Sequence, residues 1–249
     1  MTYTYIMFVG IGTVINVVAI VIGAALGVLV GNRIAEKTRN LMTDVLGAIT
    51  LIGAASAISS LWEEDLQSAV PDGSPILIVL GALLLGGLCG SALKIEERLE
   101  MVGIGLKRRF DKRGDSPFVE GFVTASLIFV IGPLAILGSI SDGMSTGIDQ
   151  LALKSTLDFF AALAFAAALG WGVALSALPV GIYQGLWTAI GFMLGSILSD
   201  YQVNAMTATG GILLLGIGLK LLGIKNMAIG NLLPSLALAP ILAFVLHSM

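Results

Sequence analysis

The sequence is poor in the residues on which most catalytic and metal sites depend. It has one cysteine, Cys89, and one histidine, His247, which lies two residues from the C-terminus. A single cysteine cannot form a disulfide within the chain, so it gives no sign of an oxidising compartment. The sequence shows no Ser/His/Asp set, no metal-ligand spacing and no phosphate-binding loop. We therefore expect no enzyme, no catalytic residue, no cofactor and no metal site.

Charged residues are also scarce. They make up 12% of the 249 residues, whereas 57% are hydrophobic and the mean hydropathy is +0.99. Soluble domains carry about 25% charged residues. The net charge is −3, and the only basic cluster lies beside an apolar run, so we expect no nucleic-acid partner.

Uninterrupted apolar runs of about twenty residues recur along the chain, each long enough to cross a hydrocarbon core about 30 Å thick. Alternating ten-residue segments, typical of a membrane barrel, are absent. The sequence predicts an all-α polytopic membrane protein that forms a single transmembrane domain over residues 1–249. The expected spans are 7–31, 43–61, 75–92, 120–140, 157–178, 181–199, 206–222 and 228–246.

The links between the expected spans differ sharply in charge. All but one of the 13 Lys and Arg residues fall in the links 32–42, 93–119 and 220–227, and the exception is Lys154. The positive-inside rule places these links in the cytoplasm, so both termini face outward. If 157–199 were a single broken pass, Lys220 and Lys225 would move outside. We therefore prefer eight spans, with a tight turn near Pro179, to seven.

The long link at 93–119 has its own pattern. Apolar residues recur at helical spacing opposite the charges, at Ile95, Leu99, Val102, Leu106 and Phe110. This predicts an amphipathic helix on the inner membrane surface, held to anionic lipid headgroups. A regulatory or partner-binding role is the alternative.

Glycine is abundant, with 32 residues, and several glycines share a face of the first span. Gly23, Gly27 and Gly31 follow the small-xxx-small spacing at which two helices approach closely. The partner is either another helix of this chain or a second copy, so a homo-oligomer through these glycines is one expectation. Asn16 lies on the same face, where its amide either bonds to a neighbouring helix or faces a wet cavity.

The expected spans place no ionisable residue clearly at mid-membrane, which argues against a proton relay. The uncharged polar residues that remain suit a neutral or zwitterionic solute, or an ion. Pro133 and Pro234 interrupt the fourth and eighth spans in "IGPLAILGSISDG" and "GNLLPSLALAP". Such breaks are either plain kinks or discontinuous helices that line a transport site.

A weak internal similarity bears on that choice. "GAALGVLVGN" can be aligned with "GFMLGSILSD", and "DVLGAITLIGAASAI" with "TATGGILLLGIGLKLL". Spans 1–3 and 6–8 would then form an inverted repeat, as in several transporter folds.

Long segments resemble the bacterial integral-membrane family known as domain of unknown function 554. The segments include "LALKSTLDFFAALAFAAALGWGVALSALPVGIYQG", "ATGGILLLGIGLKLLGIK" and "GTVINVVAIVIGAALGVLVG", and the resemblance covers nearly the whole chain. It implies a bacterial inner-membrane protein of seven or eight spans. It implies no function and identifies no catalytic residue.

The leading hypothesis is a secondary transporter or exporter of a small polar solute or ion. An oligomeric passive channel and a non-transporting accessory or regulatory module are the alternatives. We expect Asp142, Lys154 and Asp158 to form an outer gate. The residues expected to line or gate the path are Asn16, Pro133, Ser139, Asp142, Lys154, Asp158, Gln184, Asn231 and Pro234.

Overall fold

The computed structural model describes residues 8–31, 33, 35–110, 117–131, 133–194 and 198–248. Seven of its helices are long and apolar enough to cross a membrane, and one bent pair makes up to eight. This confirms the expected all-α polytopic membrane protein. The elements are α1 (Ile11–Gly31), α2 (Glu36–Ile58), η1 (Ser59–Trp62), α3 (Glu64–Ala69), α4 (Ser74–Leu93), α5 (Ile95–Phe110), α6 (Phe118–Val130), α7 (Pro133–Gly143), α8 (Asp149–Leu169), α9 (Gly172–Leu175), α10 (Ala177–Leu194), α11 (Asp200–Leu221), η2 (Ile229–Leu232) and α12 (Ser235–His247).

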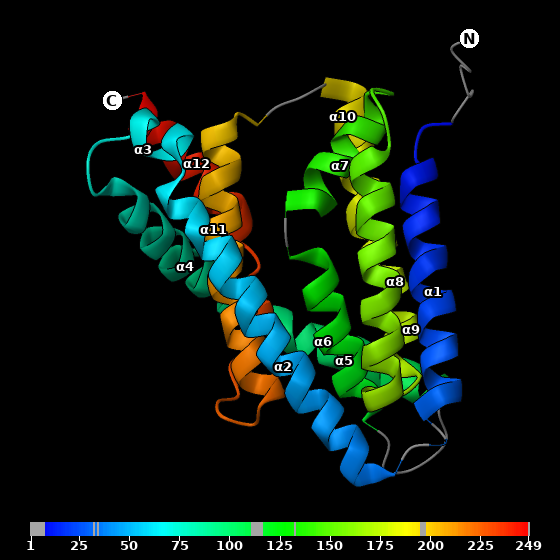
Figure 1. Cartoon of the computed structure of the whole chain (residues 1–249). Helices are drawn as coiled ribbons and strands as arrows, with labels where there is room; N and C mark the ends of the chain where they lie inside the picture. Colours follow the sequence, from blue (N-terminus) through cyan, green and yellow to red (C-terminus); the bar gives the residue numbers. More distant parts are fainter. Residues whose placement is uncertain are drawn as a thin grey trace.

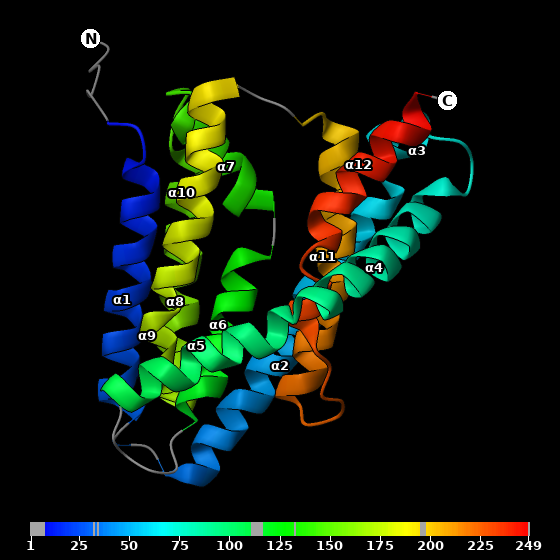
Figure 2. The ribbon, with the colours of Figure 1, turned by 180° about the vertical axis from the view of Figure 1, so that it is seen from behind.

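The helices form two lobes, which stand side by side in Figure 1. Lobe A consists of α1, α6, α7, α8, α9 and α10, and α1 packs along the length of α8. Lobe B consists of α2, α3, α4, α11 and α12, and α11 packs against α2 and α12. Helix α5 follows α4 and crosses to lobe A, as the view from behind shows (Figure 2).

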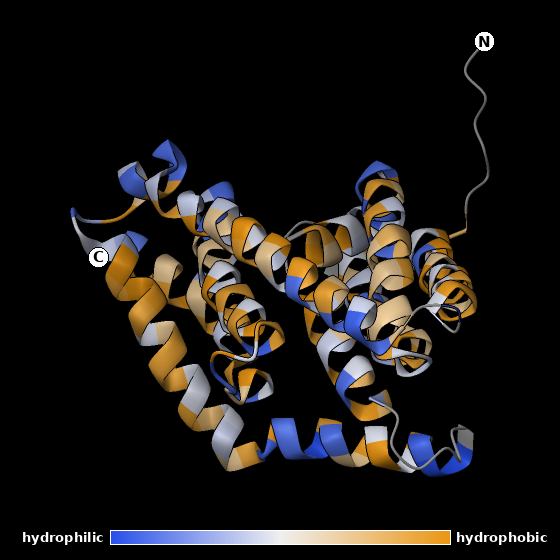
Figure 3. Cartoon of the chain, turned by 60° about the horizontal axis from the view of Figure 1, so that its bottom comes forward, coloured by the Kyte–Doolittle hydropathy of each residue, from blue (hydrophilic) through white to orange (hydrophobic). Residues whose placement is uncertain are grey.

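The two ends of the bundle differ in charge. One end holds α5, the end of α1 and the link that follows α11, and we call it the basic end. The other end holds the start of α1 and the end of α12, and we call it the acidic end (Figure 1). Helix α5 is largely hydrophilic, in contrast to the apolar α4 that precedes it (Figure 3). Leu80, Leu84 and Leu88 of α4 are exposed, as expected of side chains that face lipid.

Two predicted boundaries of the fifth and sixth spans are wrong. Helix α8 begins at Asp149, eight residues before the expected start. Charged residues near this start indicate a solvated loop in the sequence, but neighbouring helices bury Lys154 and Asp158. The turn that follows is at Gly170, with a φ of +82°, and not at Pro179. Pro179 lies in the first turn of α10, where its missing N–H has no helical acceptor to lose.

The glycine face of α1 is used within the chain. A Cβ atom at Gly23, Gly27 or Gly31 would overlap the backbone carbonyls of Phe159, Leu163 and Ala167 on α8. Helix α8 therefore fills this face, and a homo-oligomer could use these glycines only by displacing α8. Oligomerisation through another surface stays a prediction.

The fourth span is broken near its middle. Helix α6 ends at Val130, Ile131 is extended, and the two halves Phe118–Val130 and Leu134–Gly143 meet at an angle of 63°. The Ile131 side chain lies against Gly210 in the middle of α11, so the break is located where the two lobes meet. The side chain of Pro133, a predicted path residue, and residue 132 lie outside the described part of the structure.

Candidate functional site

A buried ion pair lies inside lobe A. Lys154 Nζ is 2.7 Å from Asp158 Oδ2, and the two side chains are 8% and 9% exposed. Asp158 is the tenth of the 21 residues of α8, so at 1.5 Å per residue it lies roughly 14 Å from the acidic end of that helix. The expected spans place no ionisable residue near the middle of a helix, whereas Asp158 lies near the middle of α8. Lys154 and Asp158 pair within the span and do not flank its mouth.

Asn16 connects this pair to α1. Its Nδ2 donates to Asp158 Oδ2 over 2.9 Å. Because a carboxylate only accepts, this bond fixes the orientation of the amide. Asn16 Oδ1 then points elsewhere and is buried without a hydrogen-bond partner in the described structure. The amide thus bonds to a neighbouring helix through one atom and leaves an acceptor open.

Asp142 lies at the acidic end of the same lobe. Its carboxylate accepts from the backbone N–H groups of Gly10, over 3.2 Å, and Gly12, over 3.0 Å, at the start of α1. The positive end of the helix dipole favours a carboxylate at this position. One turn earlier on α7, the buried Ser139 donates to the Ala135 carbonyl of its own helix. Asp142 therefore joins α7 to α1 and makes no contact with Lys154 that would form the expected gate.

Gln184 of α10 is fully buried, and neither atom of its amide has a hydrogen-bond partner among the described residues. Two contacts between α10 and α1 place it. Thr188 Oγ1 lies 3.4 Å from Thr13 Oγ1, and Gly181 packs against Val17. Gln184 lies between Gly181 and Thr188, so it belongs to the seam that α10 forms with α1.

The ion pair also faces the broken span. Lys154 Nζ lies 6.0 Å from the centre of the Phe129 ring, near the end of α6. A cation over an aromatic face is attracted by the ring quadrupole. Phe129 is two residues before Ile131, where α6 gives way to α7. The buried pair and the break are therefore parts of one site.

The structure separates Asn231 from the other predicted path residues. It lies at the basic end, where its Oδ1 accepts from the Glu96 backbone N–H over 2.9 Å, whereas Pro234 follows Leu233, which lines a cavity with Tyr183. Glu96 in turn accepts from the Gly230 N–H and lies 3.5 Å from Lys220 Nζ. This group joins α5 to η2 and α11, so Asn231 has a structural partner far from Asn16 and Gln184.

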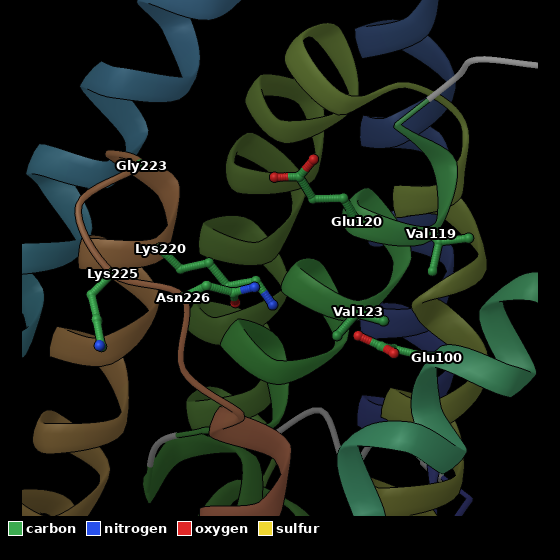
Figure 4. Close-up of a pocket in the computed structure, with 8 residues that line it drawn as sticks. All are labelled: Glu100, Val119, Glu120, Val123, Lys220, Gly223, Lys225 and Asn226. Carbon is green, nitrogen blue, oxygen red and sulfur yellow. The ribbon is translucent and has the colours of Figure 1, made fainter.

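Two cavities lie where the lobes meet. One, of about 320 Å³, is toward the acidic end and is lined by side chains of α7, α10, α11 and α12, including Tyr183, Trp187 and Met206. The other, of about 430 Å³, is at the basic end (Figure 4). Glu100 and Glu120 line it from α5 and α6, and Lys220 and Lys225 line it from the end of α11 and the segment that follows. Within the described chain, Glu100, Glu120 and Lys225 form no ion pair.

Sequence reasoning missed Thr13, Phe129 and Glu96 as members of these clusters. Thr13 is three residues before Asn16 on the same helical face, which is a usable signal. Phe129 and Glu96 give no such signal, because apolar and charged residues surround them respectively. Their roles depend on contacts between distant parts of the chain.

Comparison with known proteins agrees with this architecture. Residues 11–244 match the profile of the family described as "Protein of unknown function (DUF554)". The chain is 30% identical over 237 residues to "Uncharacterized membrane protein YdfK" of Bacillus subtilis (strain 168), covering 95% of this chain and 97% of the relative. It is 29% identical over 234 residues to "Uncharacterized protein YqgA" of Escherichia coli (strain K12), covering 92% and 94% respectively. No solved structure matches significantly. The chain is a multi-pass membrane protein that belongs to the DUF554 family.

Proposed function

We propose that this protein is a secondary transporter or exporter of a small polar solute or ion across the bacterial inner membrane. The basic end faces the cytoplasm, and both termini face outward. The proposal is carried by one observation: the Lys154–Asp158 pair is buried within α8, a candidate membrane span, beside the break between α6 and α7. Solute or ion passes through lobe A along its contact with lobe B.

The energetic cost of this arrangement supports a functional role. Desolvating a carboxylate and an ammonium costs several kcal/mol each, and a pair of apolar residues of similar volume would often be at least as stable. Ionisable residues inside a membrane accordingly mark substrate and ion pathways. A broken helix lies beside the pair, through Phe129, as in transporters that bind substrate between half-helices.

The pairing of helices supports the expected inverted repeat of spans 1–3 and 6–8. Helices α1, α2 and α4 each contact their proposed counterparts α10, α11 and α12, and each pair runs antiparallel (Figure 1). Between α2 and α11, Gly47 contacts Gly218 and Ala54 contacts Gly211. Antiparallel counterparts are what a twofold axis in the membrane plane requires.

The two cavities are suited to be the ends of the path. The acidic-end cavity lies between α10 and α12, and the basic-end cavity lies between α6 and α11. Both have walls from each lobe, so movement of one lobe against the other would change their openings. Alternating access in inverted-repeat transporters is a movement of this kind.

The test is solute uptake into proteoliposomes that contain the purified protein. Radiolabelled amino acids, mono- and dicarboxylates, sugars, Na⁺ and K⁺ are the probes, with wild type and Asp158→Asn compared. Asp149→Asn is the matched control, because Asp149 is exposed at the start of the same helix. We expect saturable uptake of one class of solute, reduced at least tenfold by Asp158→Asn and unchanged by Asp149→Asn.

Other outcomes would support a different function. Current that rises with voltage without saturating would replace the transporter by a passive channel. Absence of flux for every probe, in protein that remains folded, would favour an accessory or regulatory module. In that case α5, on the membrane surface at the basic end, would be the segment to examine for a partner.

A further inference from the structure

We infer that Thr13, Asn16, Gln184 and Thr188 form a binding site for a monovalent cation, Na⁺, in the seam between α1 and α10. The inference rests on the proposed function in one respect, because Na⁺ would be the coupling ion of transport. Binding itself is independent of transport and can be measured without it.

The four side chains converge by helix geometry. Thr13 and Asn16 are three residues apart on α1, and Gln184 and Thr188 are four apart on α10, so each pair shares a helical face. The contact between the two threonine hydroxyls and the contact between Val17 and Gly181 hold these faces together. Because the helices are antiparallel (Figure 1), Asn16 and Gln184 lie in the seam between those two contacts.

The unpartnered atoms point to a ligand. Asn16 Oδ1, Gln184 Oε1 and Gln184 Nε2 are all buried without a hydrogen-bond partner in the described structure. Each such group carries a substantial desolvation penalty, and lipid offers no compensation. The side chain of Asn16 is fixed by its bond to Asp158, so rotation cannot bring Oδ1 to another helix. A bound cation would accept both amide oxygens as ligands.

The charges around the seam favour one positive charge. The buried ionisable groups of lobe A are Asp142 on α7 and Lys154 and Asp158 on α8, and together they carry one net negative charge. The described parts of α1, α6 and α10 add only Glu120, exposed at the basic end of α6. A monovalent cation would neutralise the buried charge, whereas a divalent ion would leave an excess.

The chemistry of the ligands is that of a hard cation. Two amide oxygens and two hydroxyl oxygens are available, without a sulfur or imidazole ligand, which excludes the preferences of soft metals. Asp158, already paired with Lys154, lies behind Asn16 and orients its amide so that Oδ1 is available as a ligand, without being a ligand itself. Transporters hold Na⁺ with neutral oxygen ligands in comparable positions near mid-membrane.

The test measures thermal unfolding of the full-length protein in detergent. NaCl is titrated against choline chloride at constant ionic strength, with KCl as a second series. A ligand that binds only the native state raises Tm with its concentration. We expect Na⁺ at concentrations far above its Kd to raise Tm by roughly 5 °C, with a further logarithmic rise as the concentration increases, a smaller effect of K⁺ and none of choline.

Two substitutions distinguish a site from a structural contact. Gln184→Met keeps the volume and removes the unpartnered amide, so we expect the Na⁺ response to be lost without loss of Tm in choline. Thr188→Val should weaken the response at least tenfold in apparent affinity. Thr209→Val is the matched control, because Thr209 is buried on α11 and bonds only to the Ala205 carbonyl of its own helix. It should retain the full response.

The inference and the proposed function can fail separately. A wild-type Tm that does not distinguish Na⁺ from choline, or a Na⁺ response that survives Gln184→Met, would overturn the cation site even if solute uptake were found. A specific Na⁺ response that is lost in Gln184→Met would support the site even if no probe were transported.

Discussion

The two lobes bury polar side chains in different ways. In lobe B, Thr209 and Ser235 donate to carbonyl groups of their own chain segment, four and three residues earlier. Lobe A has bonds of this kind too, as Ser139 shows, but it also buries an amide and carboxylates that bond between helices, Asn16 to Asp158 and Asp142 to the start of α1. Three polar atoms of lobe A remain unpartnered in the described structure. A fourth, Trp187 Nε1, borders the cavity between the lobes.

This difference separates the roles of packing and polarity. A hydroxyl that bonds to its own helix needs no partner helix, so lobe B is held largely by apolar contacts and close backbone approach, with few bonds between helices, such as that from Gln202 Nε2 to the Pro240 carbonyl. The polar groups of lobe A depend on one another across three helices. We therefore regard lobe B as structural support and lobe A as the location of the candidate functional site.

The two lobes share close contacts between helices at glycines. Substitution of these glycines should have the largest effect on stability. Gly27→Leu in lobe A and Gly90→Leu in lobe B each place a side chain against a backbone carbonyl, of Leu163 and Asn231 respectively. We expect each to destabilise the protein by more than about 3 kcal/mol and to abolish a monodisperse peak in size-exclusion chromatography. Gly53→Leu, where nothing lies within 4 Å, should behave like wild type. Tolerance of Gly27→Leu would contradict the α1–α8 packing.

The next effect is confined to lobe A. Asp158→Ala leaves the Lys154 ammonium buried without its partner, so we expect a loss of about 3–5 kcal/mol in unfolding free energy. The double variant Lys154→Met with Asp158→Leu replaces the pair by apolar residues and should recover most of that loss. Denaturant unfolding in mixed micelles measures both. If the double variant is as unstable as the single one, the pair is structural and the case for a transport site is weakened.

The smallest effect concerns the connection between the lobes. Glu96→Ala removes the acceptor of the Gly230 N–H and the partner of Lys220, and we expect a loss of about 1–3 kcal/mol. Hydrogen exchange should increase in residues 226–232 while the core of lobe A is unaffected. Glu97→Ala is the control, because Glu97 is exposed on the same turn. An equal effect of both variants would show that the contact of Glu96 adds nothing.

The sequence predicts the number of spans well because each apolar run identifies a span without information from the rest of the chain. It misplaces the start of α8, since hydropathy counts Asp149, Lys154 and Asp158 as solvated and cannot register that neighbouring helices bury two of them. The pairing of Lys154 with Asp158 follows from their spacing. The bond from Asn16 to Asp158 does not, because it joins residues 142 positions apart. Asn231 shows the reverse error, in which a buried amide next to a proline break has an ordinary structural partner.

Helix α5 has a mechanical consequence. A single residue, Lys94, separates it from the end of α4 in lobe B; it lies against α6 of lobe A, and Glu96 bonds it to η2. Helix α5 thus connects the lobes at the basic end, whereas a cavity of about 320 Å³ lies between them toward the acidic end. A rocking motion of the lobes would pivot near α5, and the widest excursion would occur at the opposite membrane surface. Helix α5 would act as the pivot, so its stiffness would set how far the cavity toward the acidic end can open.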